Sequence, residues 1–292
     1  MKQKVVGIVP YAPDFGKSES RYDDKYHFTD TYCVRAHEAG LLPVGVLPVE
    51  GRIKTDILDL CDCFILQGGS NVSPYHLEVI DHALRTGKKL LGICLGAQSI
   101  QCYFAVKNEI EKRGLQGNVG DLYDEIRKEM ETPFLVRVPG HRPTEVLPRD
   151  SAESLKHPVL LLEDSHIARI LGKTEIRGCT FHFYAIGEPA PGLTVTGRAP
   201  DGVIEVIEYG ENVIGTQFHP DVDSDLHGLF DWLNARDDLS WFKQGSLHSL
   251  THTIAYRRKE FTHFRIPADG MKKRSGRSRC ALDMMIMLFR TV

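Results

Sequence analysis

Cys94 stands between two glycines in the segment GICLG, residues 92–96, directly after an apolar run that predicts a strand. The residues that follow have helical spacing, so the pattern predicts a nucleophile elbow, a tight turn that presents a reactive side chain between a strand and a helix. The N-terminus of such a helix favours a thiolate over a thiol. The alternative is a buried, unreactive cysteine that behaves as a small hydrophobic residue.

A histidine and a carboxylate occur together late in the chain, in FHPD, residues 218–221. Asp221 lies two residues after His219 and can orient its imidazole, which then accepts the thiol proton and later protonates a leaving amine. Asp223 is an alternative carboxylate. Other histidines also lie near strand or turn signals: His141, His166 and His182.

A third segment, LQGGSNVSPY at residues 66–75, places a glycine pair at the end of a buried strand. Backbone N–H groups exposed by such a loop can join the N–H of Leu95 in binding the negative oxygen of a tetrahedral intermediate. Glycine pairs are also ordinary turn formers. Each of the three segments alone is therefore weak evidence for catalysis.

The elements that must position these segments follow from the hydrophobic pattern. Apolar runs alternate with helical patterns through the first hundred residues, which predicts β-α-β units and a mostly parallel sheet. Strands are expected over 4–11, 41–49, 61–69 and 88–94, and helices over 27–39, 74–86 and 97–107. Later β-rich runs are separated by the turn signals APDG and EYGEN, which predict two hairpin-like strand pairs.

Composition divides the chain into one large domain over residues 1–240 and a basic C-terminal extension over 241–292. Within the domain, the charged and proline-containing stretch 108–157 predicts an insertion or an irregular excursion. The extension is expected to be a solvated tail, and contact with an acidic partner or a membrane surface is the alternative.

Bulk properties exclude several classes of protein. The net charge of −3 gives no nucleic-acid signature, so no nucleic acid is expected as a partner. Seven scattered cysteines argue against a disulfide framework, and Cys61 and Cys63 are too close together for a zinc knuckle. With no apolar stretch of membrane-spanning length and no secretory signal pattern, a cytoplasmic protein is expected.

Together and in this order, QGG, GICLGAQ and FHPD resemble the class I glutamine amidotransferase superfamily. Within it the likeness is greatest to the gamma-glutamyl-gamma-aminobutyrate hydrolases, a branch of the gamma-glutamyl hydrolase peptidases. GGSNVSPYHLE is similar to the glycine-rich loop of that branch, and FHFYAI and APGLTVTGRAPDGVIEVIE are similar to its later segments. The resemblance covers about residues 4–235 and implies a flavodoxin-like α/β fold with a small antiparallel β extension.

The resemblance also implies roles for individual residues. Cys94 would be the nucleophile, His219 the general base and acid, and Asp221 the partner of the histidine. Gly69 and Leu95 would supply the N–H groups of the oxyanion hole. The residues expected to contact substrate are Gly68, Asn71, Gln98, His182 and Tyr184.

The reaction implied is hydrolysis of a gamma-glutamyl amide through a thioester, which releases an amine and then glutamate without a metal or an organic cofactor. Three alternatives stay open: a glutaminase that delivers ammonia to a partner synthase, a gamma-glutamyl transferase, and a catalytically weakened regulatory homologue. The last is motivated by three departures from the pattern of the family that the chain resembles. That pattern usually has glutamate where Asp221 stands, aspartate where Asn71 stands, and two histidines and a glutamine where His182, Phe183 and Tyr184 stand. The expected partner is a small gamma-glutamyl molecule, and a homodimer stays open.

Overall fold

The computed structural model describes residues 2–12, 24–130, 134–142 and 155–235 of the chain. The predicted basic extension lies outside the described residues, as do parts of the predicted insertion, residues 131–133 and 143–154. None of the helices in the described ranges combines the length and the hydropathy needed to cross a membrane.

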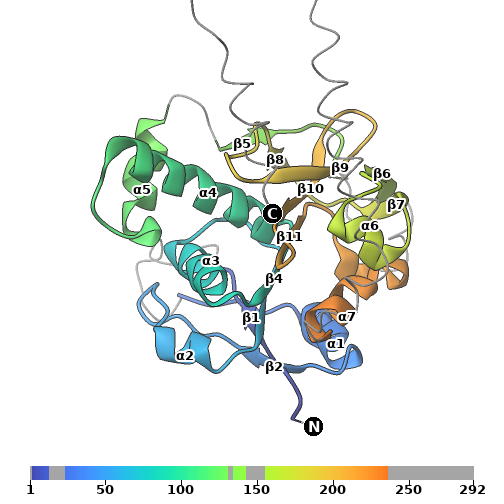
Figure 1. Ribbon diagram of the computed structural model, residues 1–292, viewed down its shortest axis with the longest axis horizontal. Helices are drawn as coiled ribbons and strands as arrows, with labels where there is room; N and C mark the ends of the chain where they lie inside the picture. The colour runs from blue at the N-terminus through green and yellow to red at the C-terminus, as the bar shows by residue number, and fades with distance from the viewer. Residues whose placement is uncertain (1, 13–23, 131–133, 143–154, 236–292) are drawn as a thin grey trace, which may run out of the picture. The chain divides into compact units, whose positions relative to one another are not determined.

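A nine-stranded sheet with the order β2-β1-β3-β4-β11-β10-β9-β6-β7 runs through the described residues (Figure 1). Its first five strands are parallel: β2 (Leu42–Gly45), β1 (Val5–Val9), β3 (Cys63–Leu66), β4 (Lys89–Ile93) and β11 (Val213–Thr216). The remaining four pair antiparallel: β10 (Ile204–Tyr209), β9 (Thr194–Arg198), β6 (Lys156–Leu161) and β7 (Glu175–Cys179). A separate antiparallel pair joins β5 (Leu135–Arg137) to β8 (Tyr184–Ile186). The predicted α/β class and both predicted hairpins, β9–β10 and β10–β11, are confirmed.

Helices cover both faces of the sheet, because the side chains of its strands alternate between two apolar layers. One layer includes Phe64 of β3 and receives Ile80, Tyr103 and Tyr123 from α3 (Pro74–Thr86), α4 (Leu95–Arg113) and α5 (Val119–Glu129). The other layer includes Ile65 and receives Tyr32, Ile167 and Trp232 from α1 (Asp30–Glu38), α6 (His166–Leu171) and α7 (Gly228–Asn234). The short helix α2 (Thr55–Asp59), which the hydrophobic pattern did not predict, lies beside α3.

The middle of the chain is more regular than the predicted excursion. Helix α4 ends at Gly114, whose φ of 63° suits glycine, and α5 then packs against α3 and α4. Val119, Tyr123 and Ile126 are buried in that contact. Residues 119–129 therefore belong to the core of the domain.

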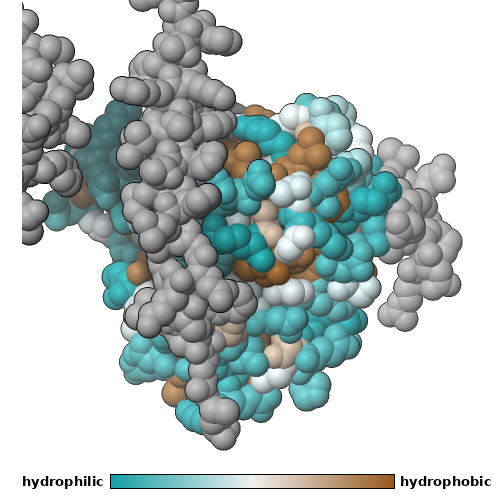
Figure 2. Space-filling model, turned by 45° about the vertical axis from the view of Figure 1, so that its right-hand side comes forward, coloured by the Kyte–Doolittle hydropathy of each residue, from teal (hydrophilic) through white to brown (hydrophobic). Residues whose placement is uncertain are grey.

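On the face drawn in Figure 2, hydrophilic and intermediate residues predominate among the coloured atoms, and hydrophobic residues form small areas between them.

Candidate active site

Three neighbouring parallel strands bring the chemistry-bearing segments to one edge of the sheet. β3 leads into Gln67–Gly69, β4 leads into Cys94, and β11 leads through Phe218 into His219. The Cys94 N–H donates to the carbonyl of Thr216 at 2.7 Å, which extends the β4–β11 pairing by one residue. The carboxyl ends of parallel strands are where open α/β sheets bind their ligands.

Cys94 has the backbone geometry of the predicted elbow. Its φ of 53° and ψ of −101° are unusual for a residue other than glycine, and it caps the N-terminus of α4. A Cβ on Gly96 would lie 2.2 Å from the Leu66 carbonyl oxygen, and one on Gly92 would lie 2.7 Å from the backbone of Gly96. Both flanking glycines are therefore required for α4 to pass this close to β3 and β4.

His219 is positioned by its backbone and by Asp221. Its N–H donates to the Cys179 carbonyl at 2.9 Å, and its Nδ1 lies 3.2 Å from Asp221 Oδ1. The other carboxylate oxygen of Asp221 accepts the Thr31 hydroxyl at 2.8 Å, and Asp221 is only 3% exposed. The Asp221 side chain, although shorter than that of glutamate, thus reaches the imidazole of His219.

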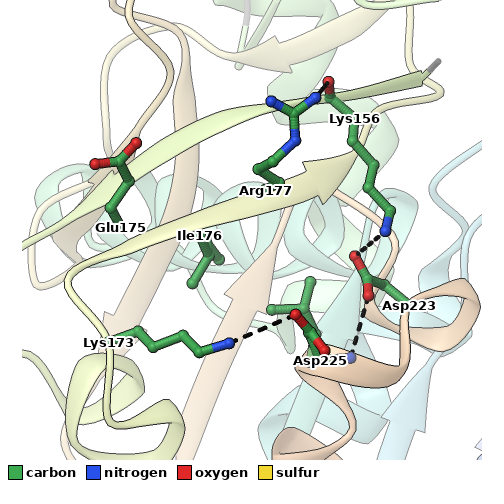
Figure 3. Close-up of a pocket in the computed structure, with 8 residues that line it drawn as sticks. Lys156, Lys173, Glu175, Ile176, Arg177, Asp223 and Asp225 are labelled. Atoms are coloured by element: carbon green, nitrogen blue, oxygen red, sulfur yellow. Dashed lines mark hydrogen bonds and ion pairs between the residues drawn. The ribbon is translucent and has the colours of Figure 1, made fainter. Parts of the chain in front are cut away.

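The alternative carboxylate, Asp223, faces a different part of the molecule. Its Oδ2 pairs with Lys156 Nζ at 2.9 Å, and its Oδ1 accepts the Asp225 N–H at 3.1 Å (Figure 3). These residues line a cavity of about 390 Å³ between β7 and the segment after His219, together with Lys173, Glu175, Ile176, Arg177 and Leu226. Asp223 therefore belongs to this cavity, and Asp221 is the residue paired with His219.

The electrostatics of the His219–Asp221 pair favour a charged imidazole on His219. Burial alone would lower the pKa of His219, but Asp221 and the Cys94 side chain outweigh it and raise the pKa well above 6.5. Burial would likewise raise the pKa of Asp221, whereas the hydrogen bonds from His219 and Thr31 leave it below the usual value for aspartate. Both shifts favour the charged forms, a carboxylate on Asp221 and an imidazolium on His219.

Gly68 lies beside both Cys94 and His219. A Cβ at this position would be 2.8 Å from His219 Cε1 and 3.6 Å from Cys94 Cβ. The Gly68 N–H donates to the Tyr32 hydroxyl at 3.0 Å, and that hydroxyl lies 3.5 Å from His219 Nδ1. Burial, reinforced by Asp221, raises the pKa of Tyr32 well above 10, so the phenol stays neutral.

Gly69 and Leu95 adjoin one another beside Cys94, as an oxyanion hole requires. A Cβ on Gly69 would lie 2.8 Å from Leu95 Cδ2. Leu95 is the first residue of α4, and N–H groups in a first helical turn have no partner within the helix.

Side chains on both sides brace the glycine loop. Gln67 Oε1 accepts the Thr29 N–H at 2.9 Å, and Gln67 Nε2 donates to the His27 carbonyl at 2.6 Å. Beyond the glycines, the Ser73 N–H donates to His76 Nδ1 at 3.0 Å, and His76 Nε2 donates to the Pro10 carbonyl at 2.9 Å. Burial lowers the pKa of His76 to about 4, so its neutral tautomer is fixed by these two bonds.

The other residues expected to contact substrate lie in different surroundings. Gln98 is buried, and its Nε2 donates to the Tyr184 carbonyl at 2.7 Å and to Gln217 Oε1 at 3.2 Å. Asn71 is exposed on the loop before α3, and the Tyr184 side chain is half exposed on β8. His182 is buried with its ring nitrogens directed at the Tyr184 carbonyl and at Glu205, so its side chain is engaged within the protein.

Sequence reasoning did not find the residues of α1 that complete the site. Thr31 and Tyr32 contact the Asp221–His219 pair although they lie almost two hundred residues earlier in the chain. They lie within residues 27–39, whose pattern predicts a helix but no functional residue. No local motif marks them.

Four other described cysteines have the properties of buried, unreactive thiols. Burial raises the pKa of Cys61 to about 11 and those of Cys63 and Cys102 to about 12, and it also raises that of Cys179. Among the cysteines of the described ranges, Cys94 alone combines a positive φ with a helix N-terminus.

The sequence profile of the peptidase C26 family matches residues 75–221, half of the 292-residue chain, and this range contains both Cys94 and His219. The chain belongs to the peptidase C26 family. Membership supports a cysteine-type amide hydrolase or amidotransferase, in agreement with the superfamily that the motifs resemble.

Relatives of this peptidase C26 chain include a glutamine amidotransferase-like protein, YvdE, of Lactococcus lactis, which is 25% identical over 66% of this chain and 78% of its own length. Protein NtpR of Enterococcus hirae is 27% identical over 67% of this chain and 83% of its own length. A solved glutamine amidotransferase of Thermotoga maritima is 13% identical, covers 89% of this chain and 94% of its own, and has a TM-score of 0.47.

Proposed function

We propose that this chain hydrolyses small gamma-glutamyl amides, with Cys94 as nucleophile, His219 as acid and base, and Asp221 as the partner of His219. The observation that carries the proposal is the meeting of Cys94 and His219 at Gly68, with His219 held by Asp221 at 3.2 Å. Membership of the peptidase C26 family supports it.

In the first half-reaction, the Cys94 sulfur forms a bond to the amide carbon while the negative charge moves onto the carbonyl oxygen. The N–H groups of Gly69 and Leu95 donate to that oxygen. The tetrahedral intermediate then collapses with breakage of the C–N bond, and His219 gives its proton to the leaving nitrogen. A gamma-glutamyl thioester on Cys94 and a free amine result.

In the second half-reaction, the neutral His219 takes a proton from a water molecule as the water oxygen attacks the thioester carbon. The C–S bond breaks, glutamate leaves, and the Cys94–His219 pair is restored with its proton on the imidazole. Asp221 stabilises the imidazolium in the resting state and again after hydrolysis. Atoms and charge balance over the cycle without any other reactant.

The aromatic segment that replaces the family's paired histidines and glutamine supports a substrate that differs in its amine. The Arg142 guanidinium carbon lies 4.5 Å from the ring centroid of Phe181 and 4.3 Å from that of Phe183. Tyr184 follows, and its carbonyl is bound by Gln98 on the elbow helix. An apolar or aromatic amine suits this surface better than a highly charged one.

A panel of gamma-glutamyl amides with apolar, aromatic and cationic amines tests the proposal, with free glutamate measured by mass spectrometry. We expect the wild type and Cys33→Ala to release glutamate and Cys94→Ala to release none, since Cys33 is a half-buried cysteine outside the site. Turnover that survives in Cys94→Ala, or no turnover of any amide by the wild type, contradicts the proposal.

Ammonia delivery to a partner synthase is the second candidate, supported by the glutamine amidotransferase-like relative. It predicts that glutamine is the preferred substrate and that ammonia release rises when a partner is added. Transfer to a second amine is distinguished by the products formed when acceptor amines are present: a transferase forms the corresponding gamma-glutamyl amides, whereas a hydrolase forms glutamate.

A further inference from the structure

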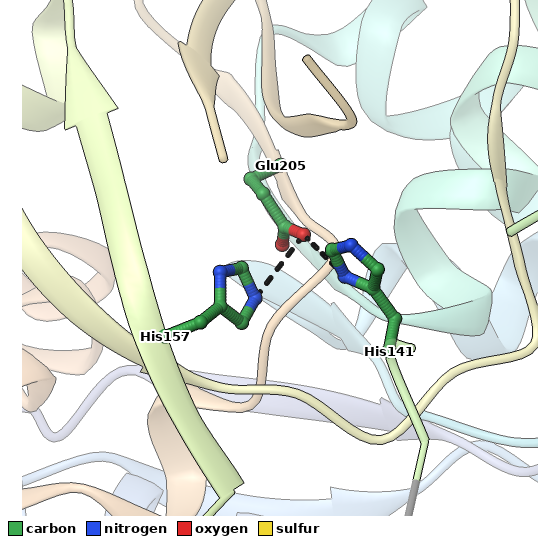
Figure 4. A group of neighbouring side chains, drawn as sticks. All are labelled: His141, His157 and Glu205. Carbon is green, nitrogen blue, oxygen red and sulfur yellow. Dashed lines mark ion pairs between the residues drawn. The ribbon is translucent and has the colours of Figure 1, made fainter. Parts of the chain in front are cut away.

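A second cluster of titratable side chains surrounds Glu205, which is fully buried on β10. Three histidines from separate segments point a ring nitrogen at its Oε1 (Figure 4 shows two of them): His141 Nδ1 at 3.3 Å, His157 Nε2 at 3.3 Å and His182 Nε2 at 3.5 Å. The proposed catalytic cycle uses none of these groups.

The carboxylate of Glu205 is poorly satisfied by direct bonds. Neither of its oxygens has a partner with hydrogen-bond geometry among the described residues, and the same holds for His157 Nε2 and His182 Nε2. Within the described ranges, no lysine or arginine forms an ion pair with it. Three imidazoles at 3.3–3.5 Å are the groups that can compensate this buried carboxylate, either as imidazolium ions or as neutral ligands that share a metal ion with it.

The distances match ligands that share one ion better than they match direct ion pairs. Charge-assisted N–H···O bonds are about 2.7–2.9 Å long, whereas neighbouring ligand atoms on a tetrahedral zinc ion, at bonds of about 2.0–2.2 Å, lie about 3.3–3.5 Å apart. The two His–Glu205 separations have this length, and the nitrogens of His141 and His157 and the oxygen of Glu205 all lie within 4.8 Å of one another. Binding of one ion would draw the two imidazoles closer together.

The outer nitrogens of the histidines have the partners that metal-bound histidines use. His141 Nε2 bonds Asp201 Oδ2 at 2.8 Å, His157 Nδ1 bonds the Pro158 carbonyl at 3.0 Å, and His182 Nδ1 bonds the Tyr184 carbonyl at 3.1 Å. An oxygen on the outer nitrogen fixes the N–H there and leaves the lone pair of the inner nitrogen for a metal ion.

From this geometry we propose that His141, His157 and Glu205 bind one divalent transition-metal ion of the zinc type, with His182 completing the set directly or through a water molecule. Imidazole and carboxylate donors without thiolate suit zinc or cobalt. The side chains of His141, His157 and Glu205 are 6%, 19% and 0% exposed, so the site is closed and structural.

The ion would tie four separate segments together beside the proposed active site. His141 follows β5, His157 lies on β6, His182 lies between β7 and β8, and Glu205 lies on β10. The Glu205 carbonyl also accepts the Gln217 N–H at 2.8 Å, two residues before His219. The function of the site is to hold the segment around Tyr184 against α4, the helix that follows Cys94.

Metal binding to the full chain tests the proposal, in a Cys94→Ala background so that the thiol cannot capture the ion. Protein stripped with a chelator is titrated with Zn²⁺ and with Co²⁺, the bound metal is counted by mass spectrometry, and the Co²⁺ absorption spectrum reports the geometry. We expect one ion per chain, a tetrahedral Co²⁺ spectrum, and a melting temperature that rises with Zn²⁺.

Glu205→Gln and His157→Gln are expected to lose the stoichiometric ion, and the exposed His37→Gln is expected to keep it. Asp201 lies on an exposed turn, so Asp201→Asn keeps the fold and should weaken binding by about 10–100-fold. A folded parent protein that binds neither metal, or Glu205→Gln and Asp201→Asn proteins that bind as tightly as the parent, would overturn the proposal. The cluster would then be an imidazolium–carboxylate network.

Discussion

Asp221 holds His219 through one carboxylate oxygen, 3.2 Å from Nδ1, while its other oxygen accepts the Thr31 hydroxyl at 2.8 Å. The family that the motifs resemble usually has glutamate here, which is one methylene longer. The short 3₁₀ helix Pro220–Val222 begins directly after His219 and turns the Asp221 backbone toward the imidazole. The helix α1 then fixes the carboxylate from the far side. The contact with His219 is thus made by the shorter side chain.

Replacing Asp221 by asparagine should lower kcat/KM for a gamma-glutamyl amide by on the order of 10²–10⁴-fold, since the oriented imidazolium loses its counter-charge. The shape of the side chain is kept, so the fold should survive, as circular dichroism would show. Asp223→Asn is the matched control and should retain turnover, because Asp223 pairs with Lys156 instead. A larger loss in Asp223→Asn would reverse the assignment.

The pH profile of kcat/KM should have its alkaline limb above pH 6.5. His219 must carry a proton to protonate the leaving amine, and its pKa is raised well above 6.5, so activity persists until the pH passes that raised value. In Asp221→Asn the lowering effect of burial is opposed less, and the alkaline limb should move to lower pH. An alkaline limb that is the same in both proteins would exclude His219 as the titrating acid.

Thr31→Val should reduce kcat by about 10–100-fold, because a hydrogen bond to a charged group contributes about 1.5–3 kcal/mol. Thr31 acts through Asp221 and touches no substrate, so KM should change little, and the alkaline limb should shift in the direction seen for Asp221→Asn. Thr31→Ser keeps the hydroxyl and should restore both kcat and the pH profile. If Thr31→Ser is as impaired as Thr31→Val, loss of the hydroxyl does not explain the lower kcat.

Gly96→Ala should lower the free energy of unfolding by at least about 2 kcal/mol, since the new methyl group would lie 2.2 Å from the Leu66 carbonyl oxygen and α4 must move. Denaturant unfolding measures the change. Gly228→Ala, at the start of α7, is the control: its methyl group would have no neighbour nearer than 3.5 Å, so stability should be unchanged or slightly higher. Equal effects at the two glycines would contradict the close packing of the elbow.

The elements that hold the proposed chemistry were predictable because their signals are local. The alternation of apolar runs and helical patterns predicted β1, β3, β4 and α3, and α3 has the bounds expected from its proline and its following glycine. Cys94, His219 and the glycine pair each follow a strand, and neighbouring strands of a parallel sheet place such residues together. The antiparallel half of the sheet depends on pairings between distant segments, which local patterns do not specify.

Sequence patterns did not predict the residues that contact Asp221 in the candidate active site and Glu205 in the histidine cluster. Thr31 contacts Asp221 across 190 positions of the chain, and His141 contacts Glu205 across 64. Neither residue lies in a motif of its own. His182 is predicted to contact substrate from its place in FHFYAI, and the structure adds that its ring nitrogens face Glu205 and the Tyr184 carbonyl. Orientation of a side chain follows from packing, which the order of residues alone does not reveal.

The thioester on Cys94 is the central claim, and intact-protein mass spectrometry tests it most directly. The chain is mixed with a gamma-glutamyl amide that it turns over, quenched in acid within the first turnovers, and digested to locate any adduct. We predict a mass increase of one gamma-glutamyl group on the peptide that carries Cys94, absent in Cys94→Ala and removed by hydroxylamine. Turnover with no adduct on Cys94, or an adduct on another residue, would contradict the account.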